Sequence, residues 1–227
     1  FGLLAFDPGK EETVANVDGD LSEWEESAVV AGDDSLSISL KQDARYLYML
    51  VQGKDLNPEN QRILIALDIT PQSGSTKYDT FAFSRAVDFV IDLNGKEDSS
   101  VKVQHYYDRY TFSYQQLDKS LDLTAYEDKQ ADSFVPVYLC LNKELFFPET
   151  KQVLEFSKYD TGKLQYGNGN PDAADYDSLS DFCYGDHAVE LRIPWSMLNF
   201  RDPSTKAIEA DFHGTGELSG YQIDEIY

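Results

Sequence analysis

The feature that most constrains this chain is the repeated alternation of apolar and polar residues with a period of two. Leu36, Ile38 and Leu40 alternate with polar residues, and the segment 188–193 (AVELRI) repeats the pattern. Successive side chains of a β-strand point to opposite faces of a sheet, so these segments predict strands with one buried face. No long segment is dominated by helix-forming residues. We therefore expect an all-β protein, a two-sheet antiparallel β-sandwich with short helical insertions.

Individual segments predict particular strands and one short helix. Residues 62–70 (RILIALDIT) are apolar on both faces and predict a central strand, which ends before Pro71. A further strand runs from Val101 to Tyr107, and we expect 110–114 to return antiparallel to it. The segment 195–200 (WSMLNF) predicts a short helix.

The length favours one domain. At 227 residues the chain fits a single sandwich domain spanning 1–227. Residues 1–17 predict an irregular lead-in segment, while 116–133 and 165–186 are charged or rich in Gly, Asn, Asp and Pro and predict surface insertions. The chain opens at Phe1, so we expect a processed product or a fragment of a longer chain.

The charge balance excludes some partners. The formal net charge of −22 disfavours nucleic acid, because that recognition depends on clustered Lys and Arg that neutralise phosphates. No apolar stretch of about 18 residues is present, so we expect no membrane insertion of this segment. The acidic excess suits a solvated extracellular surface, a bound cation or a neutral polyol.

Three segments carry a resemblance to a known family. They are 17–27 (VDGDLSEWEES), 43–55 (DARYLYMLVQGKD) and 189–198 (VELRIPWSML). Together they resemble the family 9 carbohydrate-binding modules and the DOMON-like domains, which share a two-sheet sandwich. The resemblance implies a non-catalytic accessory module of a larger secreted or cell-surface bacterial protein that acts on polysaccharides. Its partners would be a polysaccharide or oligosaccharide and the neighbouring domains of the parent chain.

The positions of the tryptophans bear on the ligand that the resemblance implies. Both, Trp24 and Trp195, fall where we expect internal plugs at the ends of the sandwich. Sugar-binding members of the family clamp a terminal sugar between two further tryptophans, and this chain has Phe81 and Phe83 ahead of the central strand instead. The resemblance therefore favours the fold more than the ligand. A purely structural spacer domain remains the alternative.

Carbohydrate binding needs exposed aromatic rings flanked by polar side chains that bond to hydroxyls. Two clusters meet this description in the sequence. The candidate residues are Tyr106, Tyr110, Tyr114 and Arg109 in the first cluster, and Tyr166 and Asn168 in the second. Packing between strands is the alternative role for each tyrosine.

One acidic segment is a candidate calcium site. In 92–98 (DLNGKED), the oxygens of Asp92, Asn94 and Asp98 could turn inward around a Gly95 bend. Asp55 matches an acidic position that resembles a calcium ligand of the family. An Asn-Gly hairpin with solvated acids is the alternative. We predict a structural Ca²⁺ ion as the cofactor.

The cysteines, Met49 and the histidines are the remaining residues that could carry redox, haem or catalytic chemistry. Cys140 and Cys183 permit one disulfide bridge, and buried thiols fit equally well. Some DOMON-like domains bind haem through a methionine, and Met49 could serve, although core packing is the simpler role. The three histidines are isolated and no nucleophile motif is present, so we expect no enzyme activity.

Overall fold

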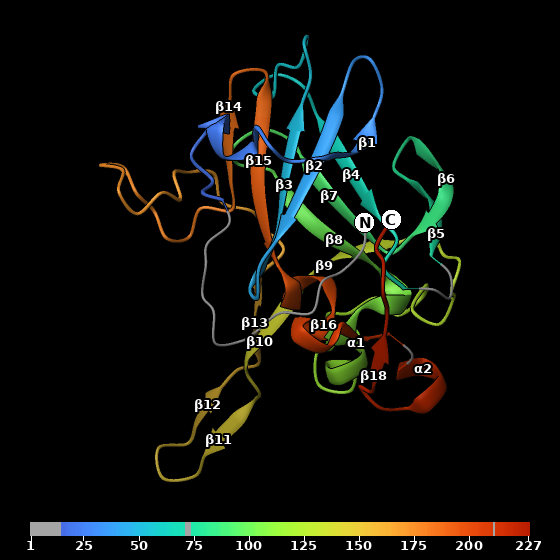
Figure 1. Ribbon diagram of the computed structural model, residues 1–227. Helices are drawn as coiled ribbons and strands as arrows, with labels where there is room; N and C mark the ends of the chain where they lie inside the picture. The colour runs from blue at the N-terminus through green and yellow to red at the C-terminus, as the bar shows by residue number, and fades with distance from the viewer. Residues whose placement is uncertain (1–14, 71–73, 211) are drawn as a thin grey trace.

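The computed structural model describes residues 15–70, 74–210 and 212–227. It is mostly β, with 41% of residues in strands and 11% in helices, and its main strands form antiparallel sheets. The predicted all-β, sandwich-like fold is confirmed. Figure 1 shows two sheets facing each other, with most of the smaller strands and helices below them and the hairpin of residues 75–87 beside them.

The first sheet has five strands. They are arranged in the order β1 (Val29–Gly32), β2 (Ser37–Gln42), β3 (Tyr46–Gln52), β15 (Ala188–Pro194) and β14 (Phe182–Gly185). Every pair is antiparallel. The predicted insertion 165–186 therefore ends earlier than expected, because its last residues pair with β15. The Gly, Asn and Asp density hid this short strand.

The second sheet has four antiparallel strands, and the main core lies between the two sheets. The order is β4 (Ile63–Leu67), β7 (Phe89–Leu93), β8 (Ser100–Gln104) and β9 (Phe134–Pro136). Alternate residues of β3 and β15 face alternate residues of this sheet. The core includes Leu47, Met49, Val51, Val189, Leu191, Ile193, Ile65, Phe89 and Ile91. Met49 is fully buried there, in the packing role considered above.

Smaller elements surround the sandwich. The hairpins are β5 (Ser75–Tyr78) with β6 (Phe81–Val87), β10 (Tyr138–Asn142) with β13 (Ser157–Asp160), and β11 (Leu145–Phe147) with β12 (Gln152–Leu154). A small sheet joins β16 (Phe200–Asp202), β17 (Ala207–Glu209) and β18 (Gly220–Gln222). The helices are α1 (Arg109–Tyr114), α2 (Phe212–Thr215) and the 3₁₀ turns η1 (Leu21–Trp24), η2 (His105–Tyr107), η3 (Trp195–Leu198) and η4 (Pro203–Thr205). Across the described ranges, no helix has the length and apolar character needed to cross a bilayer.

The prediction of a central strand at 62–70 is wrong. β4 lies at the edge of its sheet, paired only with β7 among the described strands. Its apolar outer face has another cause, because Leu64 and Ala66 pack under the β5–β6 hairpin against Tyr78 and Val87. A hairpin laid across a sheet buries a second face as well as a third layer would.

The predicted strand at 110–114 is also wrong. The segment forms α1, because the Asp108 carboxylate accepts hydrogen bonds from the backbone N–H groups of Tyr110 and Thr111 and caps the helix. An N-cap of this kind satisfies donors that have no partner within the helix. The segment 116–133 has turns but no regular element, as expected of an insertion.

Both tryptophans are internal, but only one occupies the expected place. Trp195 lies in the main core beside Phe200. Trp24 packs instead with Tyr48 and Leu50 on the outer face of the five-stranded sheet. These two residues alternate along β3 with core residues, so their side chains emerge on the outer face and need a cover. Trp24 provides that cover and does not plug an end.

Candidate functional site

The groove that offers most to a ligand is lined by residues of α1, β10 and η3. In Figure 1, α1 and β10 lie below the two sheets. It encloses about 530 Å³ and has more apolar than polar surface. Residues lining it include Tyr110, Tyr114, Tyr138, Arg109, Ser113 and Met197. Three of these were predicted for the first carbohydrate cluster, namely Tyr110, Tyr114 and Arg109.

Helix geometry brings the tyrosines of α1 together. Tyr110 and Tyr114 are separated by four positions, so they share one face of the helix, and their ring centroids lie 5.1 Å apart. Tyr138 on β10 completes the group, with its ring centroid 5.4 Å from that of Tyr110. The sequence offered no direct sign of Tyr138. The signal that could have identified the helix was Asp108. An Asp at the N-cap position accepts a hydrogen bond from the backbone N–H two or three residues later, here that of Thr111.

A charged network fixes this aromatic group. The Tyr110 hydroxyl donates to Asp118 Oδ2 at 2.9 Å, and Lys158 Nζ donates to the same oxygen at 2.7 Å. Burial alone would raise the pKa of Asp118, but the hydrogen bonds from Lys158, Ser120 and Tyr110 hold that pKa well below its ordinary value. Lys158 Nζ also lies 4.4 Å from the centroid of the Tyr138 ring. The carboxylate is thus charged and connects α1 to the hairpin.

Tyr106 and Arg109 have different surroundings from those expected. Tyr106 is only 4% exposed, and the His213 ring stacks on it at a centroid distance of 3.9 Å. The structure therefore does not bring Tyr106 to the groove. Arg109 lines the groove, with its Nε 2.8 Å from Glu209 Oε2.

The second predicted cluster is half-buried and partly covered by its neighbours. The Tyr166 ring packs edge-on against Phe182 of β14 at 5.4 Å, and Lys96 Nζ lies 4.2 Å from its centroid. Asn168 donates from its side chain to Asp175 at 3.0 Å. Tyr166 therefore extends the core beside β14, and Asn168 braces the loop that follows.

The predicted calcium ligands do not converge. The two oxygens of Asp92 accept hydrogen bonds from Arg62 at 2.8 Å each, and one also accepts from the Tyr78 hydroxyl at 2.7 Å. Asn94, Asp98 and Asp55 are exposed. Within the described residues, no group of three or more His, Cys, Asp or Glu side chains could hold a metal ion. Calcium binding stays a prediction without a formed site in this part of the chain.

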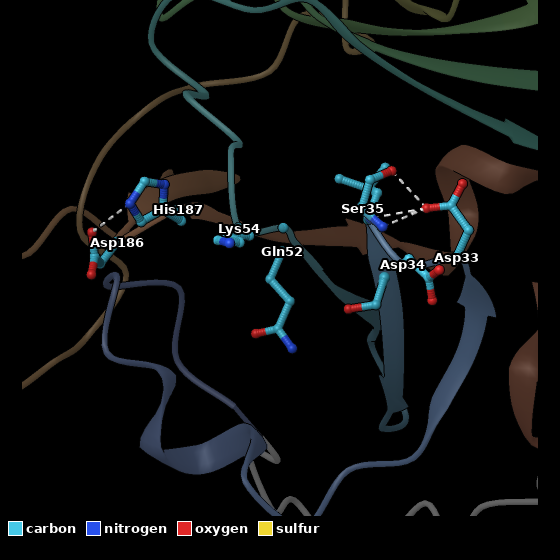
Figure 2. A pocket seen from close by; sticks show the side chains of 10 residues that line it. Asp33, Asp34, Ser35, Gln52, Lys54, Asp186 and His187 are labelled. Atoms are coloured by element: carbon cyan, nitrogen blue, oxygen red, sulfur yellow. Dashed lines mark hydrogen bonds and ion pairs between the residues drawn. The ribbon is translucent and has the colours of Figure 1, made fainter.

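A second hollow lies at the turns β1–β2, β3–β4 and β14–β15 (Figure 2). Figure 2 shows Gln52 and Lys54 between the 33–35 turn on one side and Asp186 with His187 on the other. The Asp33 carboxylate accepts hydrogen bonds from Ser35 N, Ser35 Oγ and Leu36 N, so it stabilises its own turn. The hollow lacks aromatic rings other than His187 among its described lining residues. It offers less to a sugar than the first groove.

The two cysteines are both free thiols in the structure, Cys140 half-buried beside the groove and Cys183 buried in β14. Burial raises the pKa of the Cys183 thiol above its ordinary value. Of the two alternatives left open by the sequence, the structure has the free thiols.

Comparisons with known proteins give no relative for this chain. No family model, no curated protein and no solved structure matches it.

Proposed function

We propose that the chain is a non-catalytic, extracellular accessory module that binds a neutral carbohydrate in the groove between α1, β10 and η3. The observation that carries this proposal is the set of three tyrosine rings around one hollow of about 530 Å³. The module would belong to a larger secreted or cell-surface protein that acts on polysaccharides, as the sequence resemblance implies.

The chemistry of the groove supports a sugar ligand. Aromatic faces stack on the C–H faces of sugars, while a few polar groups orient the hydroxyls. Tyr114 and Tyr138 are half-buried, so part of each ring remains accessible, and Ser113 and Arg109 supply donors close by. The net charge of −22 would repel an anionic polymer and leaves a neutral glycan as the better partner.

The acids near the groove support binding over bond cleavage. Glycoside hydrolysis commonly needs two carboxylates across the scissile bond. Asp108 is the one acid among the described residues that line the groove, and its oxygens accept hydrogen bonds from Tyr110 N, Thr111 N and Thr111 Oγ1. That carboxylate caps α1 and has little capacity left for a reaction.

Affinity electrophoresis tests the proposal. The protein is run through gels that contain a neutral glucan, xylan or mannan, after a glycan microarray has chosen the polymer. Tyr138→Ala and Tyr114→Ala remove ring surface from the groove, and each should weaken binding at least tenfold. The matched control is Tyr176→Ala, which removes an exposed tyrosine that does not line the groove, and it should bind as the wild type does.

The alternative is a purely structural spacer, in which the tyrosines only join α1 to the hairpin. The 4% exposure of Tyr110 favours that role for this one ring. Wild-type mobility that is unchanged on every polymer, together with a blank array, would leave the spacer as the function. Equal losses in Tyr138→Ala and Tyr176→Ala would place binding outside the groove.

A further inference from the structure

A two-stranded ribbon projects from the domain. We call residues 138–160 the arm; its base is the β10–β13 pair and its tip is the β11–β12 pair. Figure 1 shows the tip extending away from both sheets and from the helices. The base is anchored by Lys158, which is paired with Asp118, and by the contact between the rings of Tyr138 and Tyr110.

The tip of the arm exposes apolar side chains on both faces. Leu145 pairs with Leu154 and Phe146 pairs with Val153, and these four side chains are 45–58% exposed. Alternate residues of a strand face opposite ways, so Leu145 and Leu154 lie on one face and Phe146 and Val153 on the other. The whole arm has eight such side chains, 41–60% exposed: Leu139, Leu141, Leu145, Phe146, Phe147, Val153, Leu154 and Tyr159.

Within the described residues, the base of the arm packs on the body, whereas its tip is exposed throughout. A two-stranded hairpin is at best marginally stable in water unless it packs on something else or gains a further strand. Contiguous exposed apolar surface of this extent marks an interaction site in a soluble protein. If about half of each side chain is exposed, at roughly 170 Å² per large side chain, the arm offers about 700 Å². One face carries about half of this, roughly 350 Å², against roughly 800 Å² per partner in a standard interface, so a contact between two arms through one face is a weak one.

The charge of the arm differs from that of the body. Residues 138–160 hold three lysines, three glutamates and one aspartate, so their net charge is −1, and the rest of the chain holds −21 of the formal charge of −22. Two arms can therefore approach each other with little repulsion. Two bodies brought into direct contact would repel strongly.

We propose that the arms of two copies of this chain pair with each other and form a dimer with two-fold symmetry. A surface that meets its own copy across a two-fold axis must match itself, and two ribbons of low net charge with apolar faces fulfil this condition. Each arm has roughly eleven residues along each side, which at about 3.3 Å per residue gives roughly 35 Å. That length exceeds the Debye length of about 8 Å at physiological ionic strength, so the two acidic bodies stay screened from each other.

Sedimentation velocity of the full chain tests the proposal, at 1–100 µM protein and at several salt concentrations. The wild type should dimerise within this range. The double variant Leu145→Ser/Leu154→Ser removes apolar surface from one face of the tip and should raise the dimer dissociation constant at least tenfold. Leu179→Ser is the matched control, since Leu179 is 67% exposed outside the arm, and it should dimerise as the wild type does.

Salt dependence and a lipid-binding assay distinguish a second copy of the chain from other partners of the arm. Added NaCl should leave the dimer unchanged or tighten it severalfold, because it screens the repulsion between the bodies. A monomer at 100 µM, a dimer insensitive to Leu145→Ser/Leu154→Ser, or a dimer dissociated by salt would each overturn the proposal. Flotation of the wild-type monomer with phosphatidylcholine vesicles, lost in the same double variant, would show that the arm binds lipid and would overturn it as well.

Discussion

Glu190 carries a prediction about how stability depends on pH. Its side chain is fully buried on the outer face of the five-stranded sheet. Its carboxylate accepts hydrogen bonds from Trp24 Nε1 at 2.6 Å, Gly19 N at 2.7 Å and Asp18 N at 3.3 Å. Gly19 has φ +87°, and a Cβ there would lie 2.7 Å from the Tyr184 carbonyl oxygen, so this close approach requires glycine. Glu190 thus holds the N-terminal segment against the sheet.

The sign of the pH effect follows from the pKa of Glu190. Burial raises this pKa from the ordinary value of 4.5 to about 7, although the three hydrogen bonds oppose the rise. Between these two values the folded protein binds more protons than the unfolded chain, so the free energy of unfolding falls as the pH rises. A difference of about 2.5 pH units, at about 1.4 kcal/mol each, gives a total loss of roughly 3 to 4 kcal/mol, of which about 3 kcal/mol falls between pH 4.5 and pH 8.

Urea unfolding, followed by tryptophan fluorescence from pH 4.5 to pH 8, measures this loss. In Glu190→Gln the titrating group is gone, so the difference in unfolding free energy between the wild type and the variant should fall by about 3 kcal/mol across that range. Asp88, whose pKa burial also raises to about 7, and His105, whose pKa burial lowers, titrate in both proteins and cancel in the difference. The control is Asp186→Asn, which removes an exposed acid. Parallel profiles for the wild type and Glu190→Gln would refute the reasoning.

Two further predictions concern contacts that the sequence did not reveal. Asp108→Ala removes the cap of α1 and should lower the free energy of unfolding by about 2 kcal/mol, measured by urea unfolding, because Asp108 is buried and accepts three hydrogen bonds. The same variant should also weaken glycan binding in the gel. Unchanged binding would show that α1 does not contribute to the glycan site. Arg62→Ala leaves the buried Asp92 carboxylate without its two guanidinium donors and should cost about 3 kcal/mol in the same assay. Substitution of the exposed Arg201 by Ala is its control, and equal losses in the two variants would contradict the role of this pair.

The alternating segments predicted the sandwich because the period of a strand is local. The residues of β15 show this directly: Val189, Leu191 and Ile193 enter the core, while Glu190 and Arg192 emerge on the other face. Any antiparallel sheet built from this segment must present that division. The same locality misled us at 62–70, since an apolar outer face can be covered by a hairpin as well as by a sheet.

The candidate site was predictable only in part. Tyr110, Tyr114 and Arg109 were found from the sequence because rings and polar side chains recur at short spacing. Tyr138 and Asp118 were missed, since they meet α1 from separate segments. Tyr106 was included although it stacks on His213, a residue more than 100 positions away.

The sequence by itself determined the all-β class, the faces of the main strands and the acidic surface, because each depends on composition or on neighbouring residues. Only the tertiary structure decided that α1 and β10 line one groove and that Glu190 accepts a hydrogen bond from Trp24. It also decided that the tip of the arm extends away from the body. The groove and the contact between Glu190 and Trp24 join residues far apart in the chain. Their geometry follows from how the sheets and hairpins pack, and no local pattern of residues encodes that packing.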